Sequence, residues 1–140
     1  MILGLGFGAS ARRKRVGETL PVGDGIERGR DAFDRQAWGR AYQQLSAAAQ
    51  EEPLELGDLE RLAATAYLAG FGEESAQLWA QASQESARIG EVARAARCAF
   101  WLAFALLNGG ELARGGGWID RAQRLLDQRR GDRADRRSCR

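Results

Sequence analysis

The sequence predicts an all-α protein of about six helices, arranged as three antiparallel hairpins. Two observations carry this prediction. Alanine, leucine, glutamine, glutamate and arginine dominate residues 27–127, and the β-branched residues that favour strands are scarce there. Glycine or proline also interrupts the helical pattern at short intervals, which is typical of helices that are joined by tight turns and lie antiparallel to their neighbours.

The expected helices follow from the positions of these interruptions. Breaks occur at residues 53–57, 70–72, 89–90 and 109–110. They leave helices of roughly 8 to 19 residues. Asp58 follows the first break and is predicted to cap the start of a helix. The apolar stretch 95–107 predicts a helix that is buried on most sides, and a last helix is expected from Leu112 to about Gln128.

Both ends of the chain are predicted to be irregular, leaving one helical domain at 26–128. Residues 1–25 are glycine-rich and apolar and then basic, and residues 129–140 are rich in arginine without apolar periodicity. Gly4 to Ala9 match the G-x-G-x-x-A dinucleotide fingerprint, but the strand that this motif requires is missing before Gly4. We therefore interpret the ends as a disordered leader and a disordered tail, and we expect no cofactor.

Charge is distributed unevenly along the chain. Between Glu27 and Asp127 the acids outnumber the arginines by four, whereas the flanks carry a net charge of +6. The basic flanks support an alternative, in which the chain is a plain helical bundle whose tails bind nucleic acid directly. The last twelve residues contain no aromatic side chain to stack on bases, so this alternative ranks second.

The residue inventory argues against catalysis. The chain has no histidine, which excludes Ser-His-Asp and Cys-His nucleophilic sites and histidine-containing zinc sites. Its two cysteines, Cys98 and Cys139, are too few for a four-ligand metal site or a disulfide framework. We expect a cytoplasmic protein without enzymatic activity, metal or membrane span.

An internal repeat appears when small residues are aligned. Ala41, Ala76 and Gly115 are spaced by 35 and 39 residues. Other positions of the same alignment are also small or apolar: Gly29, Ala64 and Ala103; Ala32, Tyr67 and Leu106; Leu45, Ala80 and Ile119; Ala48, Ser83 and Ala122.

This arrangement resembles the tetratricopeptide repeat, a helix–turn–helix unit of 34 residues. The small residues match the close-packing positions of its two helices, and Pro53 stands where the repeat ends in proline. The first repeat lacks the consensus Trp and Leu, and the third lacks a closing proline. The resemblance covers residues 27–127 and implies a right-handed solenoid of about three helical hairpins.

A closer resemblance is to the tetratricopeptide region of actinobacterial LuxR-type transcriptional regulators. It is carried by Glu27–Phe33, Trp38–Tyr42, Asp58–Ala63, Ala95–Leu102 and Gly115–Leu126. The helix-turn-helix of those regulators is not present in this sequence, so DNA binding is not carried over. The resemblance implies the sensor or scaffold part of a regulator.

Such solenoids bind partners on the concave surface lined by the first helix of each pair. The alignment predicts that this surface presents Arg30, Phe33, Asp34, Arg61, Thr65, Leu68, Arg97, Phe100, Phe104 and Asn108. The three arginines could clamp carboxylates of an acidic peptide. The favoured alternative is that they pair with acids of this chain, such as Asp34, Asp58 or Glu60.

Aromatic and apolar residues elsewhere are assigned to packing or to self-association. Trp38, Trp79, Trp101 and Trp118 are interpreted as packing residues. The last helix remains apolar although no further repeat follows to cover it. A homodimer is therefore predicted through Trp118, Ile119, Ala122, Leu125 and Leu126.

Overall fold

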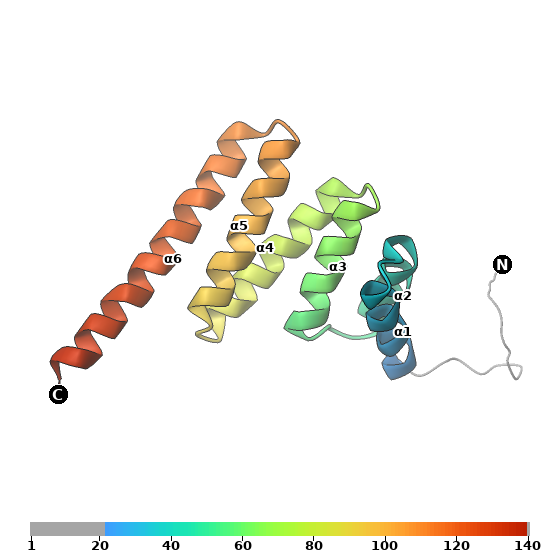
Figure 1. The fold of residues 1–140 in the computed structure, drawn as a ribbon, viewed down its shortest axis with the longest axis horizontal. Coiled ribbons are helices and arrows are strands. Elements are labelled where there is room, and N and C mark those ends of the chain that lie inside the picture. The colour runs from blue at the N-terminus through green and yellow to red at the C-terminus, as the bar shows by residue number, and fades with distance from the viewer. Residues whose placement is uncertain (1–21, 140) are drawn as a thin grey trace, which may run out of the picture.

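The computed structural model describes residues 22–139, and this part of the chain consists of six helices without a strand (Figure 1). The all-α prediction is confirmed. The helices are α1 (Val22–Asp34), α2 (Trp38–Glu51), α3 (Leu56–Leu68), α4 (Gly72–Arg88), α5 (Val92–Asn108) and α6 (Leu112–Ser138). Residues 22–25, predicted to be irregular, belong to α1, whereas the rest of the predicted leader and the dinucleotide motif lie outside the described residues.

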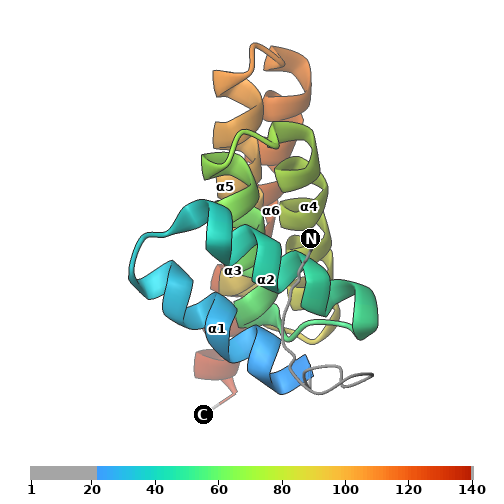
Figure 2. The same ribbon diagram turned by 90° about the vertical axis from the view of Figure 1, so that its right-hand side faces the viewer.

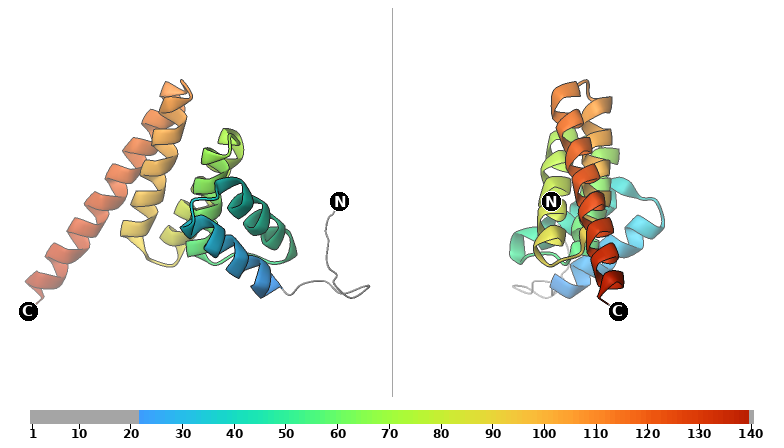
Figure 3. Two further views of the ribbon diagram at one scale, coloured as in Figure 1. Left: turned by 45° about the vertical axis from the view of Figure 1, so that its right-hand side comes forward. Right: turned by 90° about the vertical axis from the view of Figure 1, so that its left-hand side faces the viewer.

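Each helix packs against the next one in the chain, and α1 also touches α3. The helices alternate in direction from α3 to α6, so that they form a row that ends with α6 (Figure 1). The α1–α2 pair is inclined to this row (Figures 2 and 3). Within the described residues, no helix combines the length and the apolar character needed to cross a membrane.

Four of the five links between helices share one three-residue turn. The middle residue of each turn has a positive φ and is Gln36, Gly70, Gly90 or Gly110. The N–H of the following residue donates to the carbonyl five positions earlier, as from Phe71 to Ala66 at 2.8 Å. The fifth link, residues 52–55, contains proline and is extended at its two ends. Because the first turn uses glutamine rather than glycine, no break is visible there in the sequence.

These turns establish which positions of successive helices are equivalent. Measured from the positive-φ residue, Ala41, Ser75, Ala95 and Gly115 occupy the same place in α2, α4, α5 and α6, and all four are buried. Ser75, and not Ala76, is therefore the counterpart of Ala41. The predicted register is wrong by one residue in the second repeat, because α3 ends and α4 begins one residue earlier than the alignment assumed.

Close approach of neighbouring helices explains two of the small residues. A Cβ atom on Gly29 would lie 2.7 Å from the side chain of Leu45, and one on Gly115 would lie 2.7 Å from that of Leu107. Between α3 and α4, the Ser75 hydroxyl donates to the Ala63 carbonyl at 2.7 Å. The central core then gathers the buried side chains of α3, α4 and α5, namely Leu59, Ala63, Ala76, Trp79, Ala82, Cys98, Leu102 and Leu106.

Two local predictions about helix ends are wrong. Asp58 does not cap α3, because that helix begins at Leu56 and Glu55 precedes it without a side-chain cap. The tail predicted for 129–140 is helical as far as Ser138 and extends α6 past the N-terminal end of the antiparallel α5 (Figure 1). Arginine, which fills five of the positions 129–138, is a good helix former and no proline interrupts this segment, so the helix can continue despite the cost of Gly131.

Candidate functional site

The first-in-pair helices α1, α3 and α5 carry different side chains at equivalent positions. Counted back from the turn residues, Glu27, Arg61 and Trp101 are equivalent, as are Arg30, Ala64 and Phe104 and likewise Asp34, Leu68 and Asn108. These positions change from charged on α1 to mainly aromatic on α5. The two gaps between successive members of this set therefore have different chemistry.

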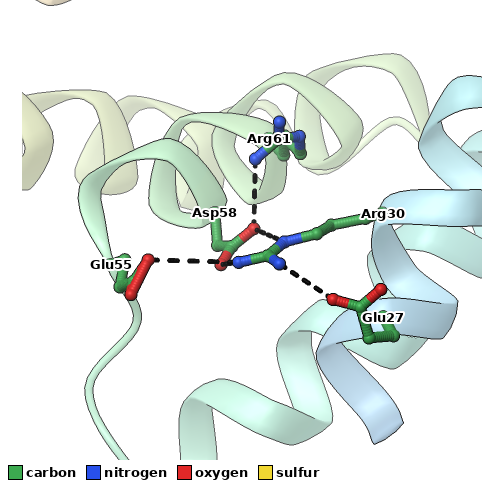
Figure 4. Close-up of polar contacts among 5 residues, drawn as sticks. All are labelled: Glu27, Arg30, Glu55, Asp58 and Arg61. Carbon is green, nitrogen blue, oxygen red and sulfur yellow. Dashed lines mark hydrogen bonds and ion pairs between the residues drawn. The ribbon is translucent and has the colours of Figure 1, made fainter. Parts of the chain in front are cut away.

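An ion-pair cluster bridges α1 and α3 (Figure 4). The Arg30 guanidinium donates from Nε and Nη2 to the two carboxylate oxygens of Asp58 at 2.9 and 2.7 Å. Arg61 donates to the same carboxylate at 3.1 Å, and Glu27 accepts from Arg30 at 2.9 Å. Asp58 is 1% exposed, so the fork of Arg30 satisfies a carboxylate that the fold has removed from water.

This cluster shifts the titration of both partners. The hydrogen bond from Arg30 holds the pKa of Asp58 below its ordinary value, against the opposing effect of burial. The same hydrogen bond raises the pKa of Arg30. The favoured prediction that Arg30 and Arg61 pair with Asp58 is confirmed, and both guanidiniums therefore form their ion pairs within the chain.

A second set of ion pairs joins α3 to α5. Glu60 accepts from Arg94 and from Arg97, the latter at 2.8 Å. Arg94 also donates to Glu91 in the turn before α5, at 3.3 Å. The predicted pairing of Arg97 with Glu60 is confirmed. It ties the N-terminal half of α5 to α3 and leaves the rest of that gap to apolar residues.

The gap between α3 and α5 contains an apolar groove of about 420 Å³. Its lining is almost entirely carbon and comes from Ala64, Tyr67, Leu68, Trp79, Trp101, Phe104 and Ala105. Leu68 is 52% exposed, Phe104 45% and Trp101 43%, so large apolar side chains remain open to solvent there. Exposed apolar clusters of this kind mark binding surfaces.

The aromatic side chains of α5 support one another along the groove. Trp101 contacts Phe100 and Phe104 edge to face, with ring centroids 5.7 and 5.8 Å apart. At the far end, the Asn108 amide donates to the Tyr67 hydroxyl at 3.3 Å. This bond gives the apolar surface a polar boundary that can orient a bound chain.

The structure separates the predicted concave residues into three groups. Phe104 and Leu68 line the groove, and Phe100 and Asn108 border it. Thr65 is fully buried and donates to the Leu62 carbonyl at 3.0 Å, so its prediction as a partner contact is wrong.

The third group lies around α1. Phe33 packs edge to face on Trp38 at 5.4 Å and lies under the Arg61 guanidinium. Asp34 is exposed at the end of the helix and makes no ion pair within residues 22–139. Neither residue reaches the groove between α3 and α5.

Five lining residues were not predicted for the binding surface, namely Ala64, Tyr67, Trp79, Trp101 and Ala105, and of these Tyr67 and Trp101 are exposed. The predicted register puts Tyr67 at the packing position that Ala66 occupies, and the apolar character of 95–107 predicts packing for Trp101. The prediction that 95–107 is buried on most sides is confirmed, and its one exposed face carries Arg97, Phe100, Trp101 and Phe104. The signal was the spacing of Arg97, Trp101, Phe104 and Asn108, which repeats with helical period and includes two polar residues.

The apolar residues of α6 are divided between two environments. Trp118 packs against the core beneath the Arg121 guanidinium, and Ala122 is buried. Ile119 and Leu126 are 43% and 41% exposed. Trp118 and Ala122 are thus occupied within the chain, and only a narrow strip of the predicted self-association surface is open.

A second cavity and a buried thiol lie outside the groove. A cavity of about 520 Å³ lies under the proline-containing link, but its lining mixes Leu54 and Ile89 with Gln81, Gln84, Glu85 and Arg88. Burial raises the pKa of the Cys98 thiol to about 11, which keeps it protonated and unreactive at neutral pH. In residues 22–139 no three metal-ligating side chains converge.

No model of a protein family matches the chain, and no curated protein is similar to it.

Proposed function

We propose that this chain is a non-catalytic helical repeat module that binds a peptide segment of a partner protein in the α3–α5 groove. The observation that carries the proposal is the groove itself, in which Leu68, Trp101 and Phe104 are exposed side by side with Tyr67. Keeping such side chains in water is unfavourable, and covering them with a partner recovers that free energy.

The groove chemistry specifies the kind of peptide. Apolar anchors, such as leucine or phenylalanine side chains, fit its carbon lining, and backbone polar groups fit the Tyr67–Asn108 end. The acidic-peptide hypothesis loses support because Arg30 and Arg61 are engaged by Asp58. Arg97 also pairs with Glu60, but its side chain remains 57% exposed and has further N–H donors that can contact a carboxylate at the groove edge.

The wider setting is part of the same proposal. Repeated antiparallel pairs with equivalent turns favour a tetratricopeptide-like solenoid, in which first-in-pair helices line the binding surface. The sequence resemblance to LuxR-type regulators favours a sensor or scaffold role in bacterial transcriptional regulation.

Peptide selection followed by affinity measurement tests the proposal. Peptides are selected from a random library on the full chain, and their affinities are compared for Trp101→Ala, Phe104→Ala and Ile89→Ala. Ile89 is a matched control, because it is 50% exposed but lies outside the groove. We expect apolar peptides whose binding weakens about 10- to 30-fold in the two groove variants and is unchanged in the control.

Retained folding is checked by circular dichroism, since Trp101 and Phe104 are nearly half exposed and their truncation costs little core packing. Selected peptides that bind both groove variants as tightly as the unmodified chain would contradict the proposed site.

A further inference from the structure

One face of α6 is uncovered where the equivalent face of α4 is buried. The shared turns make Trp79, Ser83 and Ser86 of α4 equivalent to Ile119, Gln123 and Leu126 of α6. On α4 these positions are at most 8% exposed, and the Ser83 hydroxyl donates to the Ala95 carbonyl of α5 at 2.9 Å. On α6 all three are exposed. The position that α5 occupies on α4 is therefore open on α6.

The same face becomes strongly basic beyond Leu126. At 100° per residue, Arg130, Arg133 and Arg137 fall with Ile119 and Leu126 inside an arc of about 60°. Arg129 and Arg136 lie along one edge of this arc and Asp120 and Asp127 along the other edge, nearer its apolar end, whereas Asp132 and Asp135 lie on the opposite side of the helix. This arginine stripe (Arg129, Arg130, Arg133, Arg136 and Arg137) makes no ion pair within the described part of the chain. Its helix extends past the end of α5 (Figure 1).

We infer that this face of α6 docks an acidic amphipathic helix of a partner protein, which would lie on α6 much as α5 lies on α4. Apolar residues at one end of the partner helix cover Ile119 and Leu126, and carboxylates at its other end pair with Arg130, Arg133 and Arg137. From Ile119 to Arg137 this surface needs a helix of about 18 residues, or five turns. The inference goes beyond the groove proposal, since it concerns a different surface.

The charge pattern favours an acidic helix over a second copy of this chain and over a nucleic acid. A second copy laid parallel on α6 would place one arginine stripe on the other, and an antiparallel copy centred on Leu126 would set Arg133 against Ile119. A nucleic acid would match the arginines but leave Ile119 and Leu126 uncovered.

A designed peptide pair tests the inference on the full chain. The acidic probe is an 18-residue helical peptide with leucines along one half of one face and glutamates along the other half. The basic probe carries lysines in place of the glutamates. Both are labelled, and binding is followed by fluorescence anisotropy at two salt concentrations.

We expect the unmodified chain to bind the acidic probe at least 10-fold more tightly than the basic one. Arg133→Glu with Arg137→Glu should reverse that preference. The matched control is Arg40→Glu with Arg124→Glu, which changes the net charge equally but alters exposed arginines away from this face. The control should keep the original preference. Ile119→Ser with Leu126→Ser should weaken the acidic probe about 10-fold.

Four results would overturn the inference. The first two are equal binding of both probes and loss of the preference in the control variant. The third is tight salt-sensitive binding of a 20-base-pair DNA duplex to the stripe without binding of the acidic probe. The fourth is a concentration-dependent dimer that is abolished by Ile119→Ser with Leu126→Ser and occurs without probe binding, which would assign the face to a second copy. Trp101→Ala should leave probe binding unchanged, which separates this test from that of the groove.

Discussion

The gap between α1 and α3 and the gap between α3 and α5 are equivalent in the repeat, but ion pairs close the first, whereas most of the second stays open. In the first gap, Arg30 reaches across to a buried Asp58, and Arg61 completes the cluster. In the second, Ala64 of α3 stands where Arg30 stands on α1, and Cys98 of α5 stands where Asp58 stands on α3, so no ion pair forms at these positions and the gap stays open as an apolar groove beside Trp101 and Phe104. Its ion pairs, from Glu60 to Arg94 and Arg97, are confined to one end.

The difference shows that the shared scaffold does not decide whether a gap between first-in-pair helices is closed. Two positions, that of Arg30 and Ala64 on the earlier helix and that of Asp58 and Cys98 on the later one, decide whether the helices are joined by charge or leave an apolar groove. Charged residues that find partners close the gap, whereas large aromatic residues facing Ala64 leave space. The predictions below test the two gaps separately.

The largest effect is expected from removing the carboxylate that closes the first gap. Asp58→Ala eliminates the link between α1 and α3 and leaves a small cavity beside two arginines. Since both arginine side chains are 37% exposed and can regain water, we expect a loss of about 2 kcal/mol in the free energy of unfolding, less than for a fully buried pair. Urea denaturation followed by circular dichroism measures it.

Asp34→Asn is the control for this variant. It removes an exposed acid of α1 that has no ion pair in residues 22–139, so the change should stay within about 0.5 kcal/mol. Comparable losses in Asp34→Asn and Asp58→Ala would show that the cluster does not hold α1 on α3.

Acid should weaken the ion-pair cluster that closes the first gap. The folded-state pKa of Asp58 is below the ordinary 3.8, so its contribution to stability is complete above that pH and disappears as the pH falls through the folded-state value. The difference in unfolding free energy between the unmodified chain and Asp58→Ala should therefore stay at about 2 kcal/mol from pH 5 to pH 8. It should shrink below pH 3.8. A difference that grows in acid would refute the assigned direction.

A smaller effect is expected at the ion-paired end of the second gap. Glu60→Gln weakens the contacts with Arg94 and Arg97 and should cost about 1 kcal/mol, since these groups are partly exposed. Cys98, fully buried in α5, reports the local opening when Cys139 is replaced by serine. Its labelling by a thiol reagent should become about fivefold faster in Glu60→Gln.

Glu51→Gln, at the exposed end of α2, serves as the control for Glu60→Gln and should not change the Cys98 labelling rate. An unaltered rate in Glu60→Gln itself would mean that the aromatic packing of α5, and not its charge pairs, holds the second gap together.

Much of the fold could be predicted because its causes are local. Helix-forming composition, four of the five links and the close-packed Gly29 and Gly115 follow from residues adjacent in sequence. The register of the second repeat could not be predicted from the small residues alone, since Ser75 and Ala76 are both small and only the turn at Gly70 distinguishes them. Gln36 likewise adopts a positive φ, which could not be predicted because glutamine rarely takes this conformation.

The candidate site depended on contacts between distant segments. Composition and periodicity were sufficient for the helical class, for the candidate ion pairs of Arg30, Arg61 and Arg97, and for Phe104 as a surface residue. Only the tertiary structure decided that Thr65 is buried, that Trp101 faces a groove, and that the arginines after Leu126 continue an uncovered helix face. The reason is physical: helical periodicity determines which residues share a face, but the neighbouring helices determine whether that face is covered, charged or open.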